Sequence, residues 1–495
     1  EVKKVCVACG EMKLLFSISL ALSFPHAHGL RDDALRRRVV EARNSMVTTP
    51  VPGQPTLVQL NTDQYLEGRE DEESGQRRFL GIPFALPPVD ELRWKAPQPP
   101  DESWTGTRDA SRFGDSCFQT RSGFTIGTNI SEDCLFLNVY TPPKADSGDL
   151  PVLVFFYGGS WDTGSASCPL YYGGNVVDLS GESAILVTVN YRLNVFGFMG
   201  GESLRDHGAG GTTGNWGLLD QRESLRWVQR HIASFGGDPT RVTIFGESAG
   251  AGSVATHLAS PNSYSAVSSE TGNPLFTRGM MESGNPYTAW NSQNMALAET
   301  RLSRVAVNAG CSNGSAPLDA SGAACLRSLS AQELFDAKHS GVGGPFLTWS
   351  PVEDGVELDA APRDLMAQGL FAGNASVLLG TNADEGSEFI DLPYDATQAD
   401  YEDYMMEILG SDLGALALAE YPYADFNGTQ DGKVPGHGGF WACARAVGDA
   451  FFSCPARQTV RAFSSPPSST PPPSVRAAAA AASARVAYEY FFNHT

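Results

Sequence analysis

A serine stands between glycines at residues 246–250, which read Gly-Glu-Ser-Ala-Gly. An apolar run at residues 242–245 precedes this motif, and a small-residue stretch typical of a helix follows it at residues 249–259. A nucleophilic serine needs this context, because a sharp strand-to-helix turn holds its hydroxyl clear of the backbone and glycines let neighbouring chain approach. The helix N-terminus also offers positive potential to an oxyanion. These residues predict acyl-transfer chemistry with Ser248 as the nucleophile.

The tetrahedral intermediate of acyl transfer needs two or three N–H donors for its negative oxygen. The amide of Ala249, directly after the nucleophile, is the first candidate. The others are expected in a loop that follows an earlier strand, and residues 157–161 (Tyr-Gly-Gly-Ser-Trp) come directly after the apolar run at residues 151–156. We predict that Gly159 and Ser160 are the donors in this loop.

A general base needs an acidic partner, which should lie downstream at the end of a later strand. Residues 377–380 are such a strand, and residues 382–386 (Asn-Ala-Asp-Glu-Gly) follow it. A carboxylate there could orient an imidazole and stabilise the imidazolium form. Spacing alone does not decide between Asp384 and Glu385, and a solvated loop carboxylate is the alternative for either.

The elements that must position these groups are short apolar runs separated by helical stretches. Such runs indicate parallel strands buried on both faces, which favours one doubly wound α/β domain with long excursions. The runs lie at residues 151–156, 184–189, 242–245 and 377–379, with a helix at 220–234 and a turn at 235–239. Two shorter strands are expected earlier, at residues 57–59 and 79–84.

Composition narrows the class of protein further. The chain has 495 residues, with 35 Lys and Arg against 56 Asp and Glu, a net charge of −21 and a pI near 4.8. This acidity repels phosphate backbones and anionic membranes, so nucleic-acid binding is not expected. An acidic field could steer cationic substrates, although solubility alone explains it.

The N-terminus has the pattern of a secretory signal peptide. Lys13 precedes an apolar run at residues 14–24, and small residues follow at Ala27 and Gly29. The run is too short to span a bilayer. We expect residues 1–29 to be an upstream extension plus a signal peptide that begins at Met12, followed by a charged leader at 30–54. A buried apolar helix of the mature protein is the alternative.

Two further features favour export. Five Asn-X-Ser/Thr sequons occur, at Asn129, Asn313, Asn374, Asn427 and Asn493. Nine cysteines are present, and two of them, Cys6 and Cys9, precede the expected start. The other seven lack zinc-ligand spacing, which suits disulfides in an oxidising compartment. We predict the pairs Cys117–Cys134 and Cys311–Cys325, and leave the partners of Cys168, Cys443 and Cys454 open.

Residues 464–484 are of low complexity, first rich in serine and proline and then in alanine. They offer too little apolar surface to order themselves against a core, so we expect a solvated insertion.

Residues 235–250, FGGDPTRVTIFGESAG, resemble the nucleophile signature of type-B carboxylesterases, the family of cholinesterases, neuroligins and some fungal lipases. Residues 132–139, EDCLFLNV, are similar to the second signature of that family. Further stretches agree in order, so the resemblance covers about residues 55–495 as one domain. It implies an α/β-hydrolase fold, with a central, mostly parallel doubly wound sheet, N-terminal antiparallel strands and long loop excursions.

The resemblance also implies roles for individual residues. It implies a Ser–Glu–His triad in which Glu385 occupies the acid position, and it places Gly159, Ser160 and Ala249 at the oxyanion-hole positions. The same resemblance makes Cys117–Cys134 the first disulfide of the family. Arg93 and Glu132 match a pair that the family uses as a structural salt bridge.

The sequence departs from the family pattern at two places. The base of the family comes from a loop a short way past a strand that here lies at residues 486–494, so we expect the catalytic histidine beyond Thr495 and the fragment to be inactive. His437 and His494 are the only downstream alternatives. Ser160 also stands where the family has a glycine in the oxyanion loop, and the Cβ of this serine could restrict the backbone.

Substrate class is indicated weakly. Cholinesterases place a tryptophan that stacks on choline in the first disulfide loop, but residues 118–133 are short and contain no Trp. We therefore expect a secreted hydrolase of uncharged carboxylic esters that uses no metal or organic cofactor, with a small-molecule ester as its partner. A lipase of the same family is the runner-up, and a non-catalytic adhesion protein on the same scaffold is the rival of another class.

Overall fold

The computed structural model describes residues 53–125, 128–143, 145, 148–288, 290–314, 318–338, 348–373, 375–427, 436–464 and 487–492. The expected signal peptide, most of the charged leader and nearly all of the low-complexity insertion lie outside these ranges, as do His494 and the sequons at Asn374 and Asn493. Within the described part of the chain, no helix is both long and apolar enough to cross a membrane.

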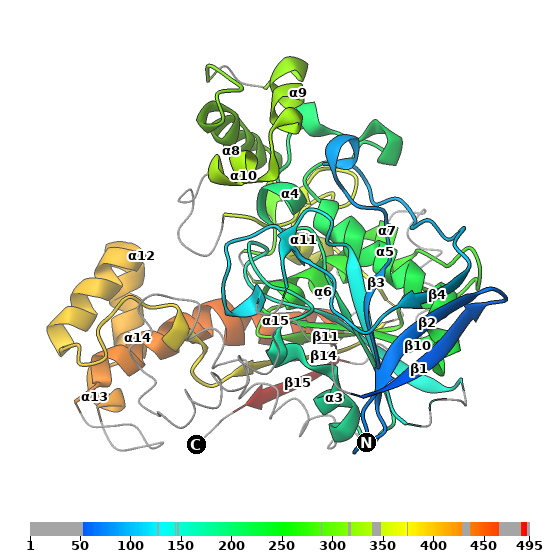
Figure 1. Cartoon of the computed structure of the whole chain (residues 1–495). Helices are drawn as coiled ribbons and strands as arrows, with labels where there is room; N and C mark the ends of the chain where they lie inside the picture. The colour runs from blue at the N-terminus through cyan, green and yellow to red at the C-terminus, as the bar shows by residue number, and fades with distance from the viewer. Residues whose placement is uncertain are drawn as a thin grey trace.

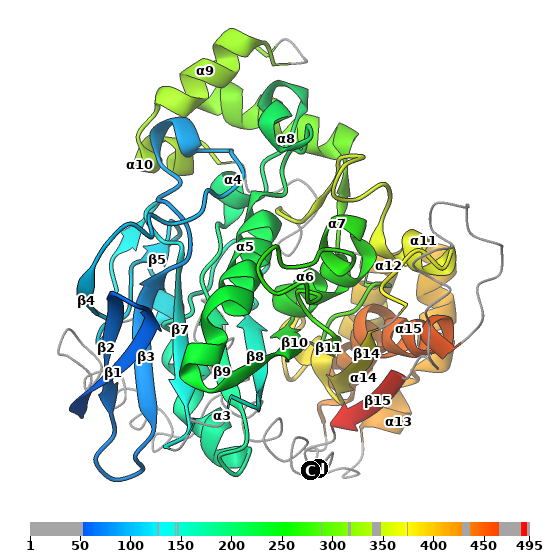
Figure 2. The ribbon, with the colours of Figure 1, turned by 90° about the vertical axis from the view of Figure 1, so that its right-hand side faces the viewer.

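A central sheet of eleven strands carries the site (Figures 1 and 2). The strands follow the order β1-β2-β3-β7-β9-β8-β10-β11-β14-β15, with β4 paired to β2. Their bounds are β1 Gln54–Asn61, β2 Gln64–Glu70, β3 Arg77–Pro83, β4 Gly106–Asp109, β7 Phe136–Thr141, β8 Leu150–Phe156, β9 Ile185–Val189, β10 Gly237–Glu247, β11 Arg278–Glu282, β14 Ser376–Asn382 and β15 Ala487–Phe492. Two small sheets pair β5 (Ser116–Cys117) with β6 (Ile130–Ser131) and β12 (Gln293–Asn294) with β13 (Val352–Glu353).

The sheet has an antiparallel and a parallel half. Strands β1, β2, β3, β7 and β9 pair antiparallel along this path. From β9 onward each neighbouring pair is parallel, through β8, β10, β11 and β14 to β15. The parallel half therefore brings the carboxyl ends of six strands to one edge of the sheet, where open α/β folds bind their ligands. This mixed sheet confirms the predicted fold class.

The apolar runs became strands for the reason expected from their pattern. All five residues of β9 are buried, as a strand covered on both faces requires. The expected turn at residues 235–239 is partly different, because β10 begins at Gly237, which pairs with Leu150 before the register shifts at Val242. The chain does turn at Gly236, whose φ of 88° favours glycine.

Helices pack against the sheet and form two groups away from it. The bounds are α3 Gly173–Leu179, α4 Asn194–Gly197, α5 Trp216–His231, α6 Ala249–Ala259, α7 Pro261–Tyr264, α8 Met295–Asn308, α9 Ala320–Ser328, α10 Ala331–Asp336, α11 Pro362–Ala367, α12 Gln398–Glu420, α13 Tyr423–Phe426, α14 Gly438–Gly448 and α15 Cys454–Ser464. Helix α6 contacts β10, the strand that leads to the serine motif, and its two neighbours in the sheet, β8 and β11. Figure 1 shows α8–α10 at the top of the molecule and α12–α14 at its left side.

The described core consists of one large hydrophobic cluster, a small one at α12 and α14, and a third formed by Ala259, Leu358 and Leu365. The large cluster holds the strands of the sheet together and includes the buried thiol of Cys168. The small cluster is built around α12 and α14 and includes the buried thiol of Cys443. Burial raises the pKa of each of these two thiols to about 12. Cys454 is also unpaired but exposed.

Candidate active site

The serine motif forms a strained corner between β10 and α6. Ser248 has a φ of 55° and a ψ of −121°, a conformation that a residue with a side chain adopts at a cost. Its amide donates a hydrogen bond to the Glu282 carbonyl at 2.9 Å, and its carbonyl accepts one from the Gly252 amide at 2.9 Å. The residue is partly exposed rather than packed in the interior. The turn therefore presents the serine at the carboxyl edge of the parallel strands.

The flanking glycines are required by crowding at this corner. A Cβ at Gly246 would lie 2.6 Å from the Phe156 carbonyl oxygen, and one at Gly250 would collide with the same oxygen. Such distances are shorter than real side chains tolerate, so only glycine allows β8 and α6 to approach each other here. The predicted reason for both glycines, close backbone approach, agrees with this geometry.

The predicted oxyanion loop lies against the serine. A Cβ at Gly158 would be 3.1 Å from the Ser248 Cβ and 2.7 Å from the Glu247 carbonyl oxygen. Gly159, Ser160 and Trp161 all have positive φ, at 105°, 57° and 53°. Asp162 and Thr163 donate their amides to the Gly159 carbonyl oxygen at 3.0 and 3.1 Å, which closes the turn.

In the described part of the chain, the amides of Gly159, Ser160 and Ala249 have no hydrogen-bond acceptor. Amides without a protein acceptor next to a strained serine are what an anion site requires, because they can donate to a developing oxyanion. Ser160 adopts the left-handed conformation despite its Cβ, so the serine in place of glycine does not prevent the turn.

The structure separates the two candidate carboxylates. Glu385 is 7% exposed and begins a short 3₁₀ helix, η7 (Glu385–Glu388), which follows β14 after Ala383 and Asp384. Its two carboxylate oxygens accept hydrogen bonds from the Asn382 amide at 2.8 Å and from Asn382 Nδ2 at 3.2 Å. Asp384 instead lies within 3.4 Å of the Arg445 guanidinium and is about one-third exposed.

A relay of contacts ties Glu385 to the serine corner. Strands β10, β11 and β14 are neighbours, with Glu247, Glu282 and Gly380 in one row across the sheet. The Glu282 carbonyl holds the Ser248 amide, and the next residue, Ser283, accepts a hydrogen bond at 3.5 Å from Asn382 Nδ2. Asn382 is thus shared between β11 and the Glu385 carboxylate. Sequence reasoning missed both Asn382 and Ser283.

No described histidine completes the constellation. Among the described residues, neither Ser248 Oγ nor the Glu385 carboxylate has a hydrogen bond to a histidine. His437 precedes α14, and its Nδ1 lies 2.8 Å from the Tyr394 carbonyl oxygen, while its ring stacks on that of Tyr394. A side chain at Gly386 would collide with the Ala444 backbone, so η7 packs against α14 at Ala444. At a rise of 1.5 Å per residue, Ala444 is roughly 10 Å along the helix from His437. His437 is therefore at the end of α14 that lies away from η7.

A buried histidine lies at the far end of α6 instead. His257 Nδ1 lies 2.9 Å from Ser263 Oγ, and its Nε2 lies 2.9 Å from Gln221 Oε1. Burial, with a smaller contribution from the Arg222 charge, lowers its pKa to about 3, so the ring is neutral at ordinary pH. Because Gln221 Oε1 accepts only, the proton sits on Nε2 and Nδ1 accepts from the Ser263 hydroxyl.

This histidine predicts a pH dependence of stability. The pKa of His257 in the folded protein lies below its unfolded value of 6.5. At a pH between these two pKa values, the unfolded chain binds more protons than the folded one, so the free energy of unfolding decreases as the pH falls. From pH 7 to pH 5 the loss from this residue is expected to be about 2 kcal/mol. Urea unfolding at both pH values should show this difference between the parent and a His257→Gln variant; equal losses in the two proteins would contradict it.

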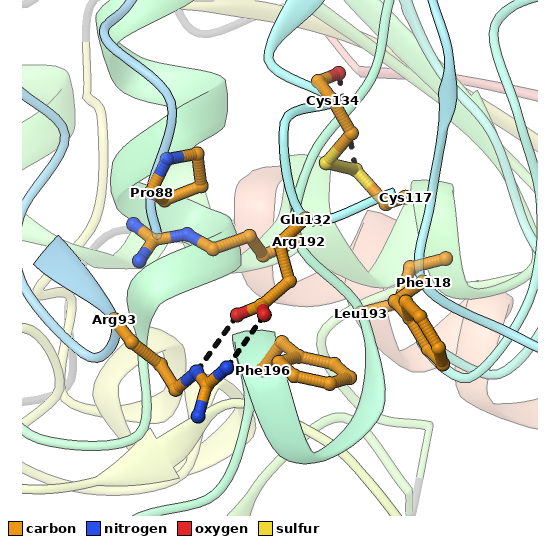
Figure 3. Close-up of a pocket in the computed structure, with 9 residues that line it drawn as sticks. All are labelled: Pro88, Arg93, Cys117, Phe118, Glu132, Cys134, Arg192, Leu193 and Phe196. Carbon is orange, nitrogen blue, oxygen red and sulfur yellow. Dashed lines mark hydrogen bonds and ion pairs between the residues drawn. A yellow bond between two sulfur atoms is a disulfide. The ribbon is translucent and has the colours of Figure 1, made fainter. Parts of the chain in front are cut away.

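The predicted covalent and ionic pairs are formed. The disulfides Cys117–Cys134 and Cys311–Cys325 are both present. The Arg93 guanidinium binds both oxygens of Glu132, at 2.8 and 2.6 Å, and donates to the Leu329 carbonyl at 2.7 Å. Figure 3 shows this pair beside the first disulfide, in a small hollow that contains no residue of the serine corner. The Arg93–Glu132 ion pair therefore has a structural role, because it links the first disulfide loop to the segment after α9.

The described residues offer no cluster of three or more His, Cys, Asp or Glu side chains that could hold a metal ion. The chemically active groups at the carboxyl edge of the parallel strands are Ser248, the three donor amides and the Glu385 carboxylate. Their arrangement can attack a carbonyl carbon, hold an oxyanion on free amides and orient an imidazole.

Comparison with known proteins agrees with this chemistry. Residues 54–471 match the model of the carboxylesterase family. The fumonisin B1 esterase of Sphingopyxis macrogoltabida is 35% identical over 407 residues, which cover 81% of this chain and 67% of that protein. The cholinesterase of Mus musculus is 35% identical over 413 residues (78% and 64%), and the acetylcholinesterase of Danio rerio is 38% identical over 330 (63% and 48%). The matches thus span about half to two thirds of these relatives' lengths.

Proposed function

Since the chain belongs to the carboxylesterase family, we propose that it hydrolyses uncharged carboxylic esters through an acyl-enzyme formed on Ser248. The observation that carries this proposal is the strained serine, which stands beside three amides that have no acceptor in the described part of the chain. A scaffold that only binds partners has no use for that strain. The rival adhesion function is therefore disfavoured.

The mechanism has two steps. Ser248 Oγ attacks the ester carbonyl carbon and passes its proton to a histidine, while the carbonyl oxygen becomes an oxyanion held by the amides of Gly159, Ser160 and Ala249. The C–O bond to the alcohol then breaks, and the alcohol leaves with the proton from the imidazolium. Water repeats the sequence on the acyl-enzyme and releases the acid.

Glu385 is the carboxylate that orients the histidine. It is held by two hydrogen bonds from Asn382, through the backbone amide and the side-chain Nδ2. Burial raises the pKa of Glu388, and the negative charge of Glu385 raises it further. Asp384 pairs instead with the Arg445 guanidinium, and we assign it no part in the reaction.

The first disulfide loop supports uncharged esters over choline esters. Its aromatic residues, Phe118 and Phe124, are the only ones in residues 118–133. Phe124 is buried, and Phe118 packs on Phe196 and Phe335 at 5.4 and 5.5 Å between ring centroids. Both rings are thus engaged in packing instead of offering a face to a quaternary ammonium group.

We also propose export through the secretory pathway. The two disulfides suit an oxidising compartment, and the sequon residues Asn129 and Asn313 are exposed, as glycosylation requires.

Covalent labelling tests the proposed chemistry. Incubating the full-length protein with a fluorophosphonate should form one Ser–O–P bond with loss of fluoride, because only an activated serine reacts. The added mass should map to the tryptic peptide of residues 242–278, and mass spectra of the same sample should show glycan at Asn129 or Asn313 if the protein is exported.

A Ser248→Ala variant is the matched control, because the same peptide contains other serines. Label that persists on this variant would contradict the proposal. Turnover of emulsified but not soluble esters by the unlabelled parent enzyme would favour the lipase alternative.

A further inference from the structure

Trp161, the last residue of the oxyanion loop, is fixed to the nucleophile helix. The residue is 1% exposed, and its indole Nε1 donates a hydrogen bond at 3.0 Å to Ser253 Oγ, on the second turn of α6. A Cβ at Gly252 would lie 2.8 and 2.9 Å from the Cζ2 and Cη2 atoms of the indole. The outer ring of Trp161 thus occupies the space that a side chain at position 252 would need.

The hydroxyl of Ser253 joins the two sources of oxyanion donors. It accepts from Trp161 Nε1 and, at 3.1 Å, from Gln221 Nε2, and it donates at 3.1 Å to the Ala249 carbonyl oxygen. A hydroxyl has one proton and two lone pairs, so its hydrogen-bonding capacity is filled. One oxygen atom therefore connects the loop that carries Gly159 and Ser160 to the residue that carries the third amide.

The anchor is itself held from behind. Gln221 and Ser253 are fully buried, and the side-chain oxygen Oε1 of Gln221 accepts from the neutral His257 ring. On the loop side, the Trp161 carbonyl accepts from the Asn194 amide at 2.7 Å. A buried network with every member satisfied is rigid, because breaking one bond leaves another group unpaired.

The loop needs such an anchor because its backbone is strained. Ser160 and Trp161 have φ of 57° and 53°, which residues with a Cβ adopt only when the surroundings impose it. Freed from α6, the loop would relax toward negative φ and turn its amides away from the serine.

We infer that Trp161 is a positioning residue for the oxyanion hole, acting through Gly252 and Ser253; this rests on the esterase function proposed above. Trp161 and Gly252 are sterically complementary, because the indole ring fills the space left by the missing side chain at position 252. Ground-state binding of the ester does not require the amides in register, whereas the oxyanion does.

The first test is Trp161→Phe in the full-length protein. It removes Nε1 and the outer ring but keeps an aromatic side chain on the loop. We expect kcat to fall about tenfold or more with KM changed less than about twofold, and the affinity for a trifluoromethyl ketone, which mimics the oxyanion, to fall in parallel. Trp227→Phe is the matched control, since it truncates a buried indole that packs on Phe235 instead of on α6.

The second test uses the missing side chain. Gly252→Ala should lower kcat, because its methyl group displaces the Trp161 ring, although alanine is the better helix former. In the double variant with Trp161→Phe, the atoms that collide are gone, so kcat should return to that of Trp161→Phe alone. The side-chain oxygen of Asn291 also lies near this position, 2.6 Å from the added Cβ, on a buried side chain whose Nδ2 donates to the Asn285 carbonyl. This contact is the same with Trp or Phe at position 161, so it does not contribute to the coupling between positions 161 and 252.

Two results would overturn the inference. One is a Trp161→Phe enzyme with lowered stability but unchanged kcat, which would make the tryptophan a packing residue only. The other is multiplication of the two single effects in the double variant, which would show that the two positions act independently. Fluorophosphonate titration of the parent separates this failure from failure of the proposed function, because an unlabelled Ser248 would refute the esterase itself.

Discussion

Ser248→Ala is expected to reduce kcat for ester hydrolysis roughly a millionfold, to the level left by binding and the oxyanion site alone. No other group in the described site can form the covalent intermediate, so its loss cannot be compensated. Initial rates with soluble short-chain esters would measure the effect. KM for residual turnover should change little, because the hydroxyl contributes mainly after binding.

Stability measurements on the same position distinguish a strained nucleophile from an ordinary surface serine. Alanine keeps the Cβ at a φ of 55°, whereas glycine adopts that conformation without steric cost. A Ser248→Gly variant should therefore unfold at a temperature no lower than the alanine variant. Ser260→Ala, at the other end of α6, serves as the control and should retain turnover. Ester hydrolysis by Ser248→Ala at the parent rate would refute the mechanism.

Glu385→Gln is expected to lower kcat about ten-thousandfold, because the amide keeps the shape of the side chain but cannot stabilise an imidazolium. Asp384→Asn is the matched control on the adjacent residue and should change kcat less than about threefold. Steady-state kinetics of both variants, with thermal unfolding to confirm folding, makes the comparison.

The two carboxylate variants decide a question that spacing left open. Equal losses would indicate that the whole turn, rather than one carboxylate, is needed. The reverse order would assign the acid to Asp384 and contradict the burial and hydrogen bonds that favour Glu385.

Much of the fold could be predicted because its strands carry their own signal. Residues 151–156 and 184–189 are apolar enough to be read as doubly covered strands, and they became β8 and β9. Strand β11 was missed, since its sequence Arg-Gly-Met-Met-Glu has only two large apolar residues between charges. It exists because β10 and β14 provide hydrogen-bonding partners on both sides, which no local pattern reveals.

Part of the candidate site could likewise be predicted from the sequence, and part could not. The serine corner was predictable, because a strained turn demands glycines at fixed offsets that can be seen in the sequence. The choice between Asp384 and Glu385 depends on which side chain faces Asn382, and the role of Gly252 depends on a ring 91 positions earlier in the chain. Such contacts arise only when distant segments pack, so sequence spacing holds no record of them.

The two buried thiols give the molecule separate internal reporters. Cys168 lies in the large hydrophobic cluster and Cys443 in the small one between α12 and α14. Alkylating reagents attack the thiolate, which the raised pKa and burial suppress at both positions in the closed protein. Each cysteine becomes reactive only when its own cluster opens. Pulse alkylation can therefore measure the opening rate of the small cluster at α12 and α14 independently of the opening rate of the large cluster at the sheet.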